Sequence, residues 1–248
     1  MSELATARGD RLLALALEAP PDELGEALAN EALTEEQLIA ILRRRDLSGE
    51  LLRTVAQNTR WIGKYLVKSV VVMNPATPKP IAMNLVKFLF WRDLVKVMNN
   101  FALDPPVRVA ADKVLRDRLD EMTLGERVAL ARVGSREIVQ ALRRVREEPV
   151  FQALLTNPRL TEEDLVPIAT DPQTPAPILS SIVRHARWNN RYNLRLAVVR
   201  NPTTPPAVAL SQLITLSEKD LRDLGRHQSV TSAVRSAAVQ VLERRSSG

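Results

Sequence analysis

A long internal repeat constrains the fold of this chain more than any other feature. When the sequence is shifted by 127 residues, residues 30–118 align with residues 157–245 without a gap. Repeated phrases at one fixed offset are typical of repeat architectures, so we interpret the two segments as an internal duplication. The matching phrases are Leu33-Thr34-Glu35-Glu36 with Leu160-Thr161-Glu162-Glu163, Arg60-Trp61 with Arg187-Trp188, Asn74-Pro75-x-Thr77-Pro78 with Asn201-Pro202-x-Thr204-Pro205, and Val107-Arg108-x-Ala110-Ala111 with Val234-Arg235-x-Ala237-Ala238.

The composition favours helices along the whole chain. Hydrophobic residues make up 45% of the sequence, but aromatic residues make up only 4% and glycine occurs only 8 times. Ala, Leu, Val and Arg dominate, which predicts an all-α fold with little sheet character. Cysteine is absent, which excludes disulfides and thiolate metal sites. No apolar run reaches the roughly 20 residues of a membrane span, so we expect a soluble, cytoplasmic protein.

Each half divides again, more weakly, at a shift of 43 residues, and each unit then contains three short helices. We expect each first helix to begin after a threonine N-cap, with proline tolerated in the first turn. Those caps are Thr34, Thr77, Thr161 and Thr204. The second helices are predicted at 47–57, 90–100, 174–185 and 217–227. The third helices are predicted at 61–73, 105–118, 189–200 and 231–245.

The remaining segments complete one continuous domain over residues 1–248. Residues 1–31 are predicted to form a two-helix N-terminal cap, divided at Pro20-Pro21, ahead of the first duplicated half at 32–118. Residues 119–156 are predicted to form a bridging unit before the second duplicated half at 157–245. Its three helices are expected to start at Thr123, Ser135 and Glu148-Pro149.

Two phrases carry a resemblance to known repeat classes. They are Leu196-Ala197-Val198-Val199-Arg200-Asn201-Pro202-Thr203-Thr204-Pro205 and Pro105-Pro106-Val107-Arg108-x-Ala110. The chain resembles armadillo and HEAT-type repeats and is similar to bacterial leucine-rich-variant helical repeats. This resemblance implies a right-handed α-solenoid of about five three-helix units plus the cap. It also implies partner binding on a concave inner surface, without any particular chemistry.

One repeated phrase combines most of the Trp and Tyr residues of the chain with cations. At helical spacing its three cations form one stripe, with Trp and Tyr beside them. Such a surface suits an acidic or extended partner segment, because cations pair with carboxylates and aromatic faces hold a peptide. The candidate partner-binding residues are Arg60, Trp61, Lys64, Tyr65 and Lys68 in the first copy and Arg187, Trp188, Asn190, Arg191, Tyr192 and Arg195 in the second.

The same phrase also has a purely structural interpretation. Trp and Tyr can recur because they pack between units, with the long basic side chains lying over them. Arg60 also shares a helix face with Val67, a residue expected to be buried, so the stripe could border the core. Both interpretations remain open at the level of sequence.

Other recurrent polar residues have ordinary structural interpretations. The basic clusters Arg43-Arg44-Arg45, Arg143-Arg144-x-Arg146 and Arg244-Arg245 lie near helix C-termini, where cations complement the helix dipole. Arg108 and Arg235 either reach the groove or pair with Asp93 and Asp220, and we favour the pairs. The two histidines, His185 and His227, correspond to Asn58 and Asn100 in the first half and are interpreted as structural residues.

These features predict a non-enzymatic binding scaffold. The chain lacks a His-Glu-x-x-His motif, a Gly-rich phosphate loop and a Gly-x-Ser-x-Gly elbow, so we expect no catalytic residues, no metal and no cofactor. The net charge of +6 favours an anionic partner, most simply an acidic protein segment. The alternatives are a HEAT-like protein that binds DNA or RNA, and a HEAT-like DNA glycosylase using Asp93 or Asp220. The oligomeric state stays open.

Overall fold

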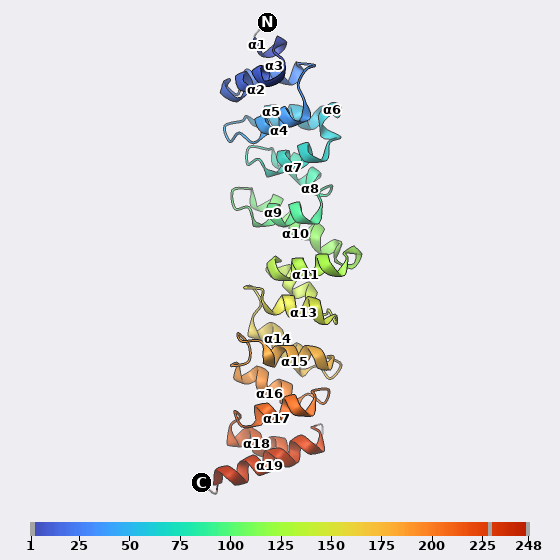
Figure 1. Cartoon of the computed structure of the whole chain (residues 1–248), viewed down its shortest axis with the longest axis vertical. Coiled ribbons are helices and arrows are strands. Elements are labelled where there is room, and N and C mark those ends of the chain that lie inside the picture. Colours follow the sequence, from blue (N-terminus) through green and yellow to red (C-terminus); the bar gives the residue numbers. More distant parts are fainter. Residues whose placement is uncertain (1–2, 228–229, 247–248) are drawn as a thin grey trace. The chain divides into compact units, whose positions relative to one another are not determined.

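The structure, a computed structural model, describes residues 3–227 and 230–246, and every regular element in these ranges is helical. The all-α prediction is confirmed. The helices up to residue 117 are α1 Glu3–Thr6, α2 Gly9–Glu18, α3 Leu24–Ala29, α4 Glu35–Leu42, α5 Gly49–Gln57, α6 Thr59–Ile62, α7 Tyr65–Met73, α8 Lys79–Val86, α9 Trp91–Asn99 and α10 Pro105–Asp117. After the short 3₁₀ helix Leu119–Glu121 come α11 Leu124–Val133, α12 Arg136–Leu142, α13 Glu148–Leu155, α14 Glu162–Thr170, α15 Ala176–Arg184, α16 Tyr192–Arg200, α17 Pro206–Leu213, α18 Glu218–Arg226 and α19 Ser232–Ser246 (Figure 1).

The contacts divide the chain into two compact units. Unit 1 is Met1–Asp120 and unit 2 is Glu121–Gly248, so the boundary falls close to the start of the predicted bridging unit. The prediction of one continuous domain stays a prediction. None of the described helices has the length and apolar character needed to cross a membrane.

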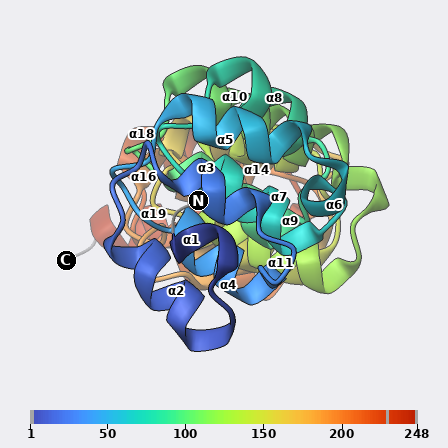
Figure 2. The same cartoon turned by 90° about the horizontal axis from the view of Figure 1, so that it is seen from above.

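Within each unit, alternate helices stack on one another. In unit 1, α4 packs on α7, α7 packs on α9, and α8 packs on α10. Seen from above, α5, α8 and α10 lie together on one side of unit 1 (Figure 2). In unit 2, α14 packs on α16, α13 on α15 and α17 on α19. Helices that follow one another also pack closely, as α9 does on α10 and α18 on α19, and the three-helix unit stays a prediction.

Helix starts that depend on local capping were predicted correctly. The Thr34 and Thr161 side chains form capping boxes with the third residues of α4 and α14. Thr123 and Ser135 cap α11 and α12 by accepting from the backbone three residues later. A side-chain oxygen at the N-cap satisfies a backbone N–H that has no partner within the helix, which explains these starts.

Two of the predicted threonine caps are wrong. The hydroxyls of Thr77 and Thr204 are buried and donate backward to the carbonyls of Val71 and Val198, at 2.5 and 2.6 Å. The helices begin one residue later than expected, after prolines 78 and 205. These threonines therefore satisfy the last carbonyls of one helix rather than the first amides of the next.

The two predicted third helices that carry the Arg-Trp/Tyr phrase start late. The backbone is extended at Lys64 and at Arg191, directly before α7 and α16. Trp61 lies on the separate short helix α6, and Trp188 lies in a turn. The stripe of three cations on one helix is therefore wrong. The N-terminal cap also differs from the prediction, because it contains the three helices α1, α2 and α3 instead of two.

Four buried asparagines, Asn30, Asn74, Asn157 and Asn201, bind backbone carbonyls at the ends of earlier helices. The Asn74 amide donates to the carbonyls of Leu42 at 3.0 Å and Arg44 at 2.9 Å, and its oxygen accepts from the amide of Ala76. A buried helix end needs such partners, since each unsatisfied carbonyl is costly. Asn30, Asn157 and Asn201 make the same contacts with the segments before them.

Candidate functional site

The two tryptophans of the repeated phrase are part of the core. Trp61 is 3% exposed and Trp188 is 2% exposed. The indole N–H of Trp188 donates to the carbonyl of Leu155 at 2.9 Å. Buried aromatic rings of this size contribute strongly to packing, so the structural interpretation holds for both tryptophans. Their ring faces are not available to hold a partner peptide in this structure.

The arginines that precede these tryptophans also have structural contacts. The Arg60 guanidinium donates to the carbonyls of Glu31 at 3.0 Å and Leu33 at 2.7 Å and lies 4.2 Å from the Trp61 ring centroid. The Arg187 guanidinium repeats this arrangement, with the carbonyls of Asn157 and Leu160 at 2.8 and 2.9 Å and the Trp188 ring at 4.3 Å. Each arginine thus links its own segment to backbone carbonyls 27–30 residues earlier in the chain.

Each of the two tyrosines binds an aspartate that lies 28 residues further along the chain. The Tyr65 hydroxyl donates to Asp93 at 2.5 Å and accepts from the Phe90 amide at 3.0 Å. The Tyr192 hydroxyl donates to Asp220 and accepts from the Ser217 amide. The predicted pairs of these aspartates with Arg108 and Arg235 are therefore wrong, and Arg108 lies over the ring of Phe101 instead.

The protonation of the Tyr65–Asp93 pair follows from its surroundings. Burial, together with the neighbouring carboxylate of Asp93, raises the pKa of Tyr65 to about 12. Burial alone would raise the pKa of Asp93, but hydrogen bonds from Lys96 and Tyr65 outweigh that effect and hold it below its usual value. The pair is thus a neutral phenol donating to a carboxylate over the physiological pH range.

Replacing Tyr65 by phenylalanine should lower the free energy of unfolding by about 1–2 kcal/mol, because both hydrogen bonds of the hydroxyl disappear. The raised pKa in the folded state means that this contribution is present below pH 10 and is lost as the pH rises through about 12. Urea unfolding of the unmodified protein and Y65F should give a smaller difference in the free energy of unfolding at pH 11.5 than at pH 8. A difference that is constant with pH would contradict the assignment.

The remaining predicted site residues are less enclosed. Lys64 lies 3.8 Å from the Glu35 carboxylate, and Arg191 lies 3.9 Å from the Glu162 carboxylate. Asn190 is exposed. Lys68 lies over the ring of Phe88 and Arg195 over the ring of Tyr192, at 5.4 and 5.9 Å from the ring centroids. In the structure, the tryptophans of the phrase thus belong to the core, while Lys64, Asn190 and Arg191 are exposed.

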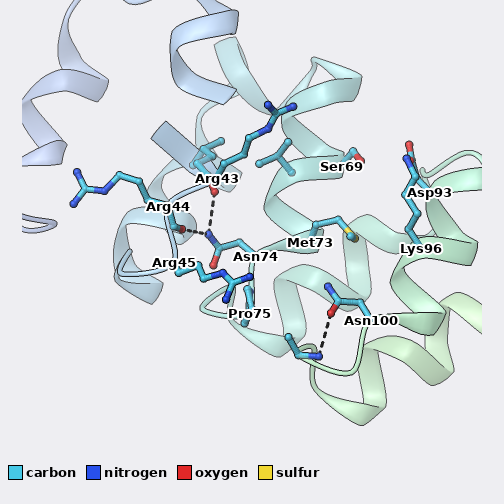
Figure 3. Close-up of a pocket in the computed structure, with 13 residues that line it drawn as sticks. Arg43, Arg44, Arg45, Ser69, Met73, Asn74, Pro75, Asp93, Lys96 and Asn100 are labelled. Carbon is cyan, nitrogen blue, oxygen red and sulfur yellow. Dashed lines mark hydrogen bonds and ion pairs between the residues drawn. The ribbon is translucent and has the colours of Figure 1, made fainter. Parts of the chain in front are cut away.

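A pocket that the sequence did not single out lies between α4, α7 and α9 of unit 1. It has a volume of about 570 Å³, and we call it the basic pocket. Figure 3 shows the Arg43–Arg45 segment on one side, Asp93 and Lys96 on the other, and Met73 of α7 between them. Ser69 and Asn100 add polar groups to the wall. Most of the lining side chains are polar or charged, and Val70 and Met73 form a small apolar floor between them.

Two arginines at the rim of the basic pocket have no anionic partner. Arg44 donates to the carbonyls of Ala16 and Ala19, both at 2.8 Å, and pairs with Asp46 at 2.6 Å. Arg43 and Arg45 are exposed, and neither forms an ion pair with any residue in the described ranges. The cluster lies at a helix C-terminus as predicted, because Arg43 is the C-cap residue of α4 and Arg44 and Arg45 follow it, and Arg44 also caps the end of α2. The other two guanidinium groups are available to an anion.

Unit 2 has a pocket at the equivalent positions, 127 residues further along the chain. Its volume is about 560 Å³, and it lies between α14 and α16. The chemistry differs, because Thr170 and Pro172 replace the two free arginines of the basic pocket, and Arg200 replaces Met73. A second pocket of about 790 Å³ shares Val166 and Asn193 with it and contains Arg187 and Arg191. We call this pair of adjoining pockets the C-terminal trough.

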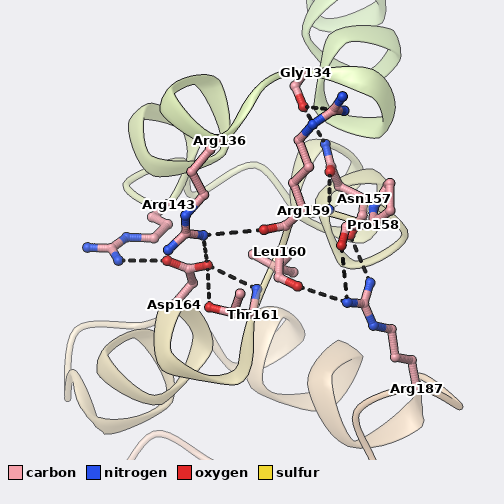
Figure 4. Close-up of polar contacts among 10 residues, drawn as sticks. All are labelled: Gly134, Arg136, Arg143, Asn157, Pro158, Arg159, Leu160, Thr161, Asp164 and Arg187. Carbon is pink, nitrogen blue, oxygen red and sulfur yellow. Dashed lines mark hydrogen bonds and ion pairs between the residues drawn. The ribbon is translucent and has the colours of Figure 1, made fainter.

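A buried carboxylate lies beside the C-terminal trough. The Asp164 side chain is 1% exposed and contacts the guanidinium groups of Arg136 and Arg143, the second at 3.0 Å, and the Thr161 hydroxyl at 2.8 Å (Figure 4). Burial would raise the pKa of Asp164, but these hydrogen bonds outweigh it and hold the pKa at about 2. Both carboxylate oxygens accept from groups of the protein, Oδ1 from Arg143 and Oδ2 from Arg136 and Thr161, so the charge of Asp164 is compensated within the fold.

The two histidines lie at separate places in unit 2. The Nδ1 atom of His185 accepts from the Arg187 amide at 3.3 Å, as the Asn58 side chain does from the Arg60 amide at 2.9 Å. Burial and the neighbouring Arg187 lower the pKa of His185. His227 lines the C-terminal trough. Across residues 3–227 and 230–246, no group of three or more His, Cys, Asp or Glu side chains is placed to hold a metal ion.

No protein-family model, curated protein or solved structure matches this chain. The geometry of the pockets is therefore the basis for any functional assignment.

Proposed function

We propose that this protein is a binding scaffold of the α-solenoid type, and that its basic pocket holds an acidic, extended segment of a partner protein. The solenoid and the duplication are supported by contacts that recur 127 residues apart. They include the asparagine, Arg–Trp and Tyr–Asp contacts described above. Helices this short depend on stacking against neighbours, as repeat proteins require.

The observation that carries the binding proposal is the pair of unpartnered arginines at the basic pocket. Arg43 and Arg45 lie at one rim and Lys96 lies at the other, with apolar side chains of α7 between them. An acidic segment would place carboxylates against the guanidinium groups and one apolar side chain on Val70 and Met73. Lys96 is held by Asp93 at 2.8 Å, so the two arginines are the principal recognition groups.

The pocket suits a peptide better than a nucleic acid. Nucleic-acid grooves combine many phosphate-binding cations with aromatic platforms on which bases stack. The wall of the basic pocket contains no aromatic residue, and it includes the carboxylate of Asp93. The buried tryptophans also remove the aromatic platform that the sequence suggested. The same considerations leave the glycosylase alternative without support, since both aspartates considered for it bind tyrosines.

Reversing the two arginine charges tests this proposal. The full-length protein and the variant R43E/R45E are titrated into a fluorescein-labelled peptide of about twelve residues that alternates glutamate with leucine. In an extended conformation such a peptide is about 40 Å long, which is enough to cross the pocket. We expect the variant to bind at least about tenfold more weakly, since charge reversal at a contact replaces attraction by repulsion. Fluorescence anisotropy provides the dissociation constants.

The matched control is R132E/R144E, which makes the same change in net charge. Arg132 and Arg144 are exposed and form no ion pair with residues in the described ranges. This control should bind the peptide within about twofold of the unmodified protein, allowing for long-range steering. Equal losses in both variants would show non-specific attraction and reject the pocket. If a single-stranded oligonucleotide binds more tightly than the peptide does, and R43E/R45E loses that binding too, a nucleic-acid partner would be favoured instead.

A further inference from the structure

The turn between α8 and α9 exposes large aromatic side chains. Phe88 is 54% exposed and Phe90 is 66% exposed, while Leu89 between them is 1% exposed. Trp91 follows at the start of α9 and is half-buried. Together with Lys87 and Arg92 we call residues 87–92 the aromatic turn. Exposed aromatic side chains clustered in this way mark interaction surfaces more often than scattered ones do.

Cations without carboxylate partners surround these rings. The ammonium groups of Lys68 and Lys87 lie 5.4 and 5.3 Å from the Phe88 ring centroid, and the Arg92 guanidinium lies 5.5 Å from that of Trp91. None of these three cations forms an ion pair with a residue in the described part of the chain. The nearest acid in sequence, Asp93, is engaged by Tyr65 and Lys96. The aromatic turn is therefore both apolar and positively charged.

The equivalent turn of unit 2 shows that the fold does not need these side chains. Arg118 donates to the carbonyls of Lys87 and Leu89, and Arg245 donates in the same way to the carbonyls of Ile214 and Leu216. The backbone of both turns is thus held alike. The aromatic residues are nevertheless replaced there, since Thr215, Ser217 and Glu218 stand at the positions of Phe88, Phe90 and Trp91.

We propose that the aromatic turn binds the surface of an anionic lipid membrane. Phenylalanine and tryptophan side chains insert at the boundary between headgroups and acyl chains, while neighbouring lysines and arginines remain at the level of the lipid phosphates. The aromatic turn has this composition, with two exposed rings at a turn and Lys68, Lys87 and Arg92 around them. The interaction is peripheral. It would be a second binding function of the protein, separate from that of the basic pocket.

Contacts at the ring faces favour a membrane over a nucleic acid. A base stacks on an open aromatic face, but the Phe90 ring already lies 4.3 Å from the Tyr65 ring, and Phe88 has two ammonium groups over it. Insertion into lipid needs exposed ring edges and tips instead. Lysine-rich surroundings also differ from protein interfaces, in which lysine is depleted.

Co-sedimentation of the full-length protein with vesicles tests the proposal. Vesicles of phosphatidylcholine alone are compared with vesicles containing about 30% phosphatidylserine, whose surface potential attracts cations near the membrane. We expect binding to the anionic vesicles, weaker binding in high salt, and little binding to the neutral ones. The variant F88T/F90S carries the residues of the equivalent turn and should bind at least about tenfold more weakly.

The matched control is F101S/I214T, which also removes two large exposed apolar side chains. Phe101 is 78% exposed and Ile214 is 69% exposed, and both lie outside the aromatic turn. This control should bind the anionic vesicles as the unmodified protein does. Absence of vesicle binding by the unmodified protein, or equal binding by F88T/F90S, would overturn the proposal. Binding of a single-stranded oligonucleotide that depends on Phe88 and Phe90 would overturn it in favour of nucleic acid.

Discussion

Replacement of Trp188 by alanine is expected to lower the free energy of unfolding by about 3–5 kcal/mol, the range for large aromatic side chains removed from a core. The side chain is 2% exposed, its N–H donates to the Leu155 carbonyl at 2.9 Å, and the Arg187 guanidinium lies on its ring. The variant loses all three contacts and leaves a cavity. Chemical denaturation of the two proteins, followed by circular dichroism, provides the measurement.

The first copy of the phrase offers a matched comparison for this hydrogen bond. Trp61 is as deeply buried as Trp188, but its indole N–H has no hydrogen-bond partner among the described residues. W188F should therefore cost about 1–2 kcal/mol more than W61F, because it leaves the Leu155 carbonyl without its donor. Equal costs for the two phenylalanine variants would contradict the assigned hydrogen bond. A W188A protein that is fully stable would contradict its place in the core.

Replacement of Asp164 by alanine should be similarly damaging. The carboxylate is 1% exposed and pairs with Arg136 and Arg143, and its oxygens also accept from the Thr161 hydroxyl and amide. Removal of one partner from a buried charge network costs about 3–5 kcal/mol. D164A also removes the acidic half of the capping box of α14, which adds to the loss. Denaturant titration at pH 7 measures the change.

The pH dependence of stability gives an independent check on Asp164. Its pKa lies at about 2 in the folded protein, below the ordinary value of 3.8. A lowered pKa contributes stability that is present above pH 3.8 and is lost as the pH falls through about 2. The contribution amounts to about 2 kcal/mol. The stability difference between the unmodified protein and D164N should therefore be full at pH 5 and nearly absent at pH 2.

Glu163, the exposed neighbour of Asp164, provides the control for this titration. E163Q removes a carboxylate at the adjacent position that acts on Arg136 by its charge but forms no ion pair or hydrogen bond with Asp164, Arg136 or Arg143. Its stability relative to the unmodified protein should change little between pH 5 and pH 2. A D164N difference that persists at pH 2 would show that the charge of Asp164 is not what stabilises α14.

The candidate site was only partly predictable from sequence. The repeated phrase correctly marked residues with equivalent roles in both halves, including Arg60 with Arg187 and Tyr65 with Tyr192. It could not reveal that these arginines bind backbone carbonyls, and these tyrosines bind carboxylates, of neighbouring helical segments. Such partners lie about 27 or 28 residues away in sequence. No local pattern distinguishes an arginine that caps a distant helix from one that faces a ligand.

What the sequence determined by itself is the set of features with local causes. The all-helical class and the starts of α4, α11, α12 and α14 follow from helix propensity and from capping within four residues. The tertiary structure alone decided that alternate helices stack on one another, that both tryptophans are buried, and that Arg43 and Arg45 form no ion pair within the described residues while Arg44 does. These outcomes depend on which side chains a neighbouring helix brings within reach, and packing between distant segments sets that distance.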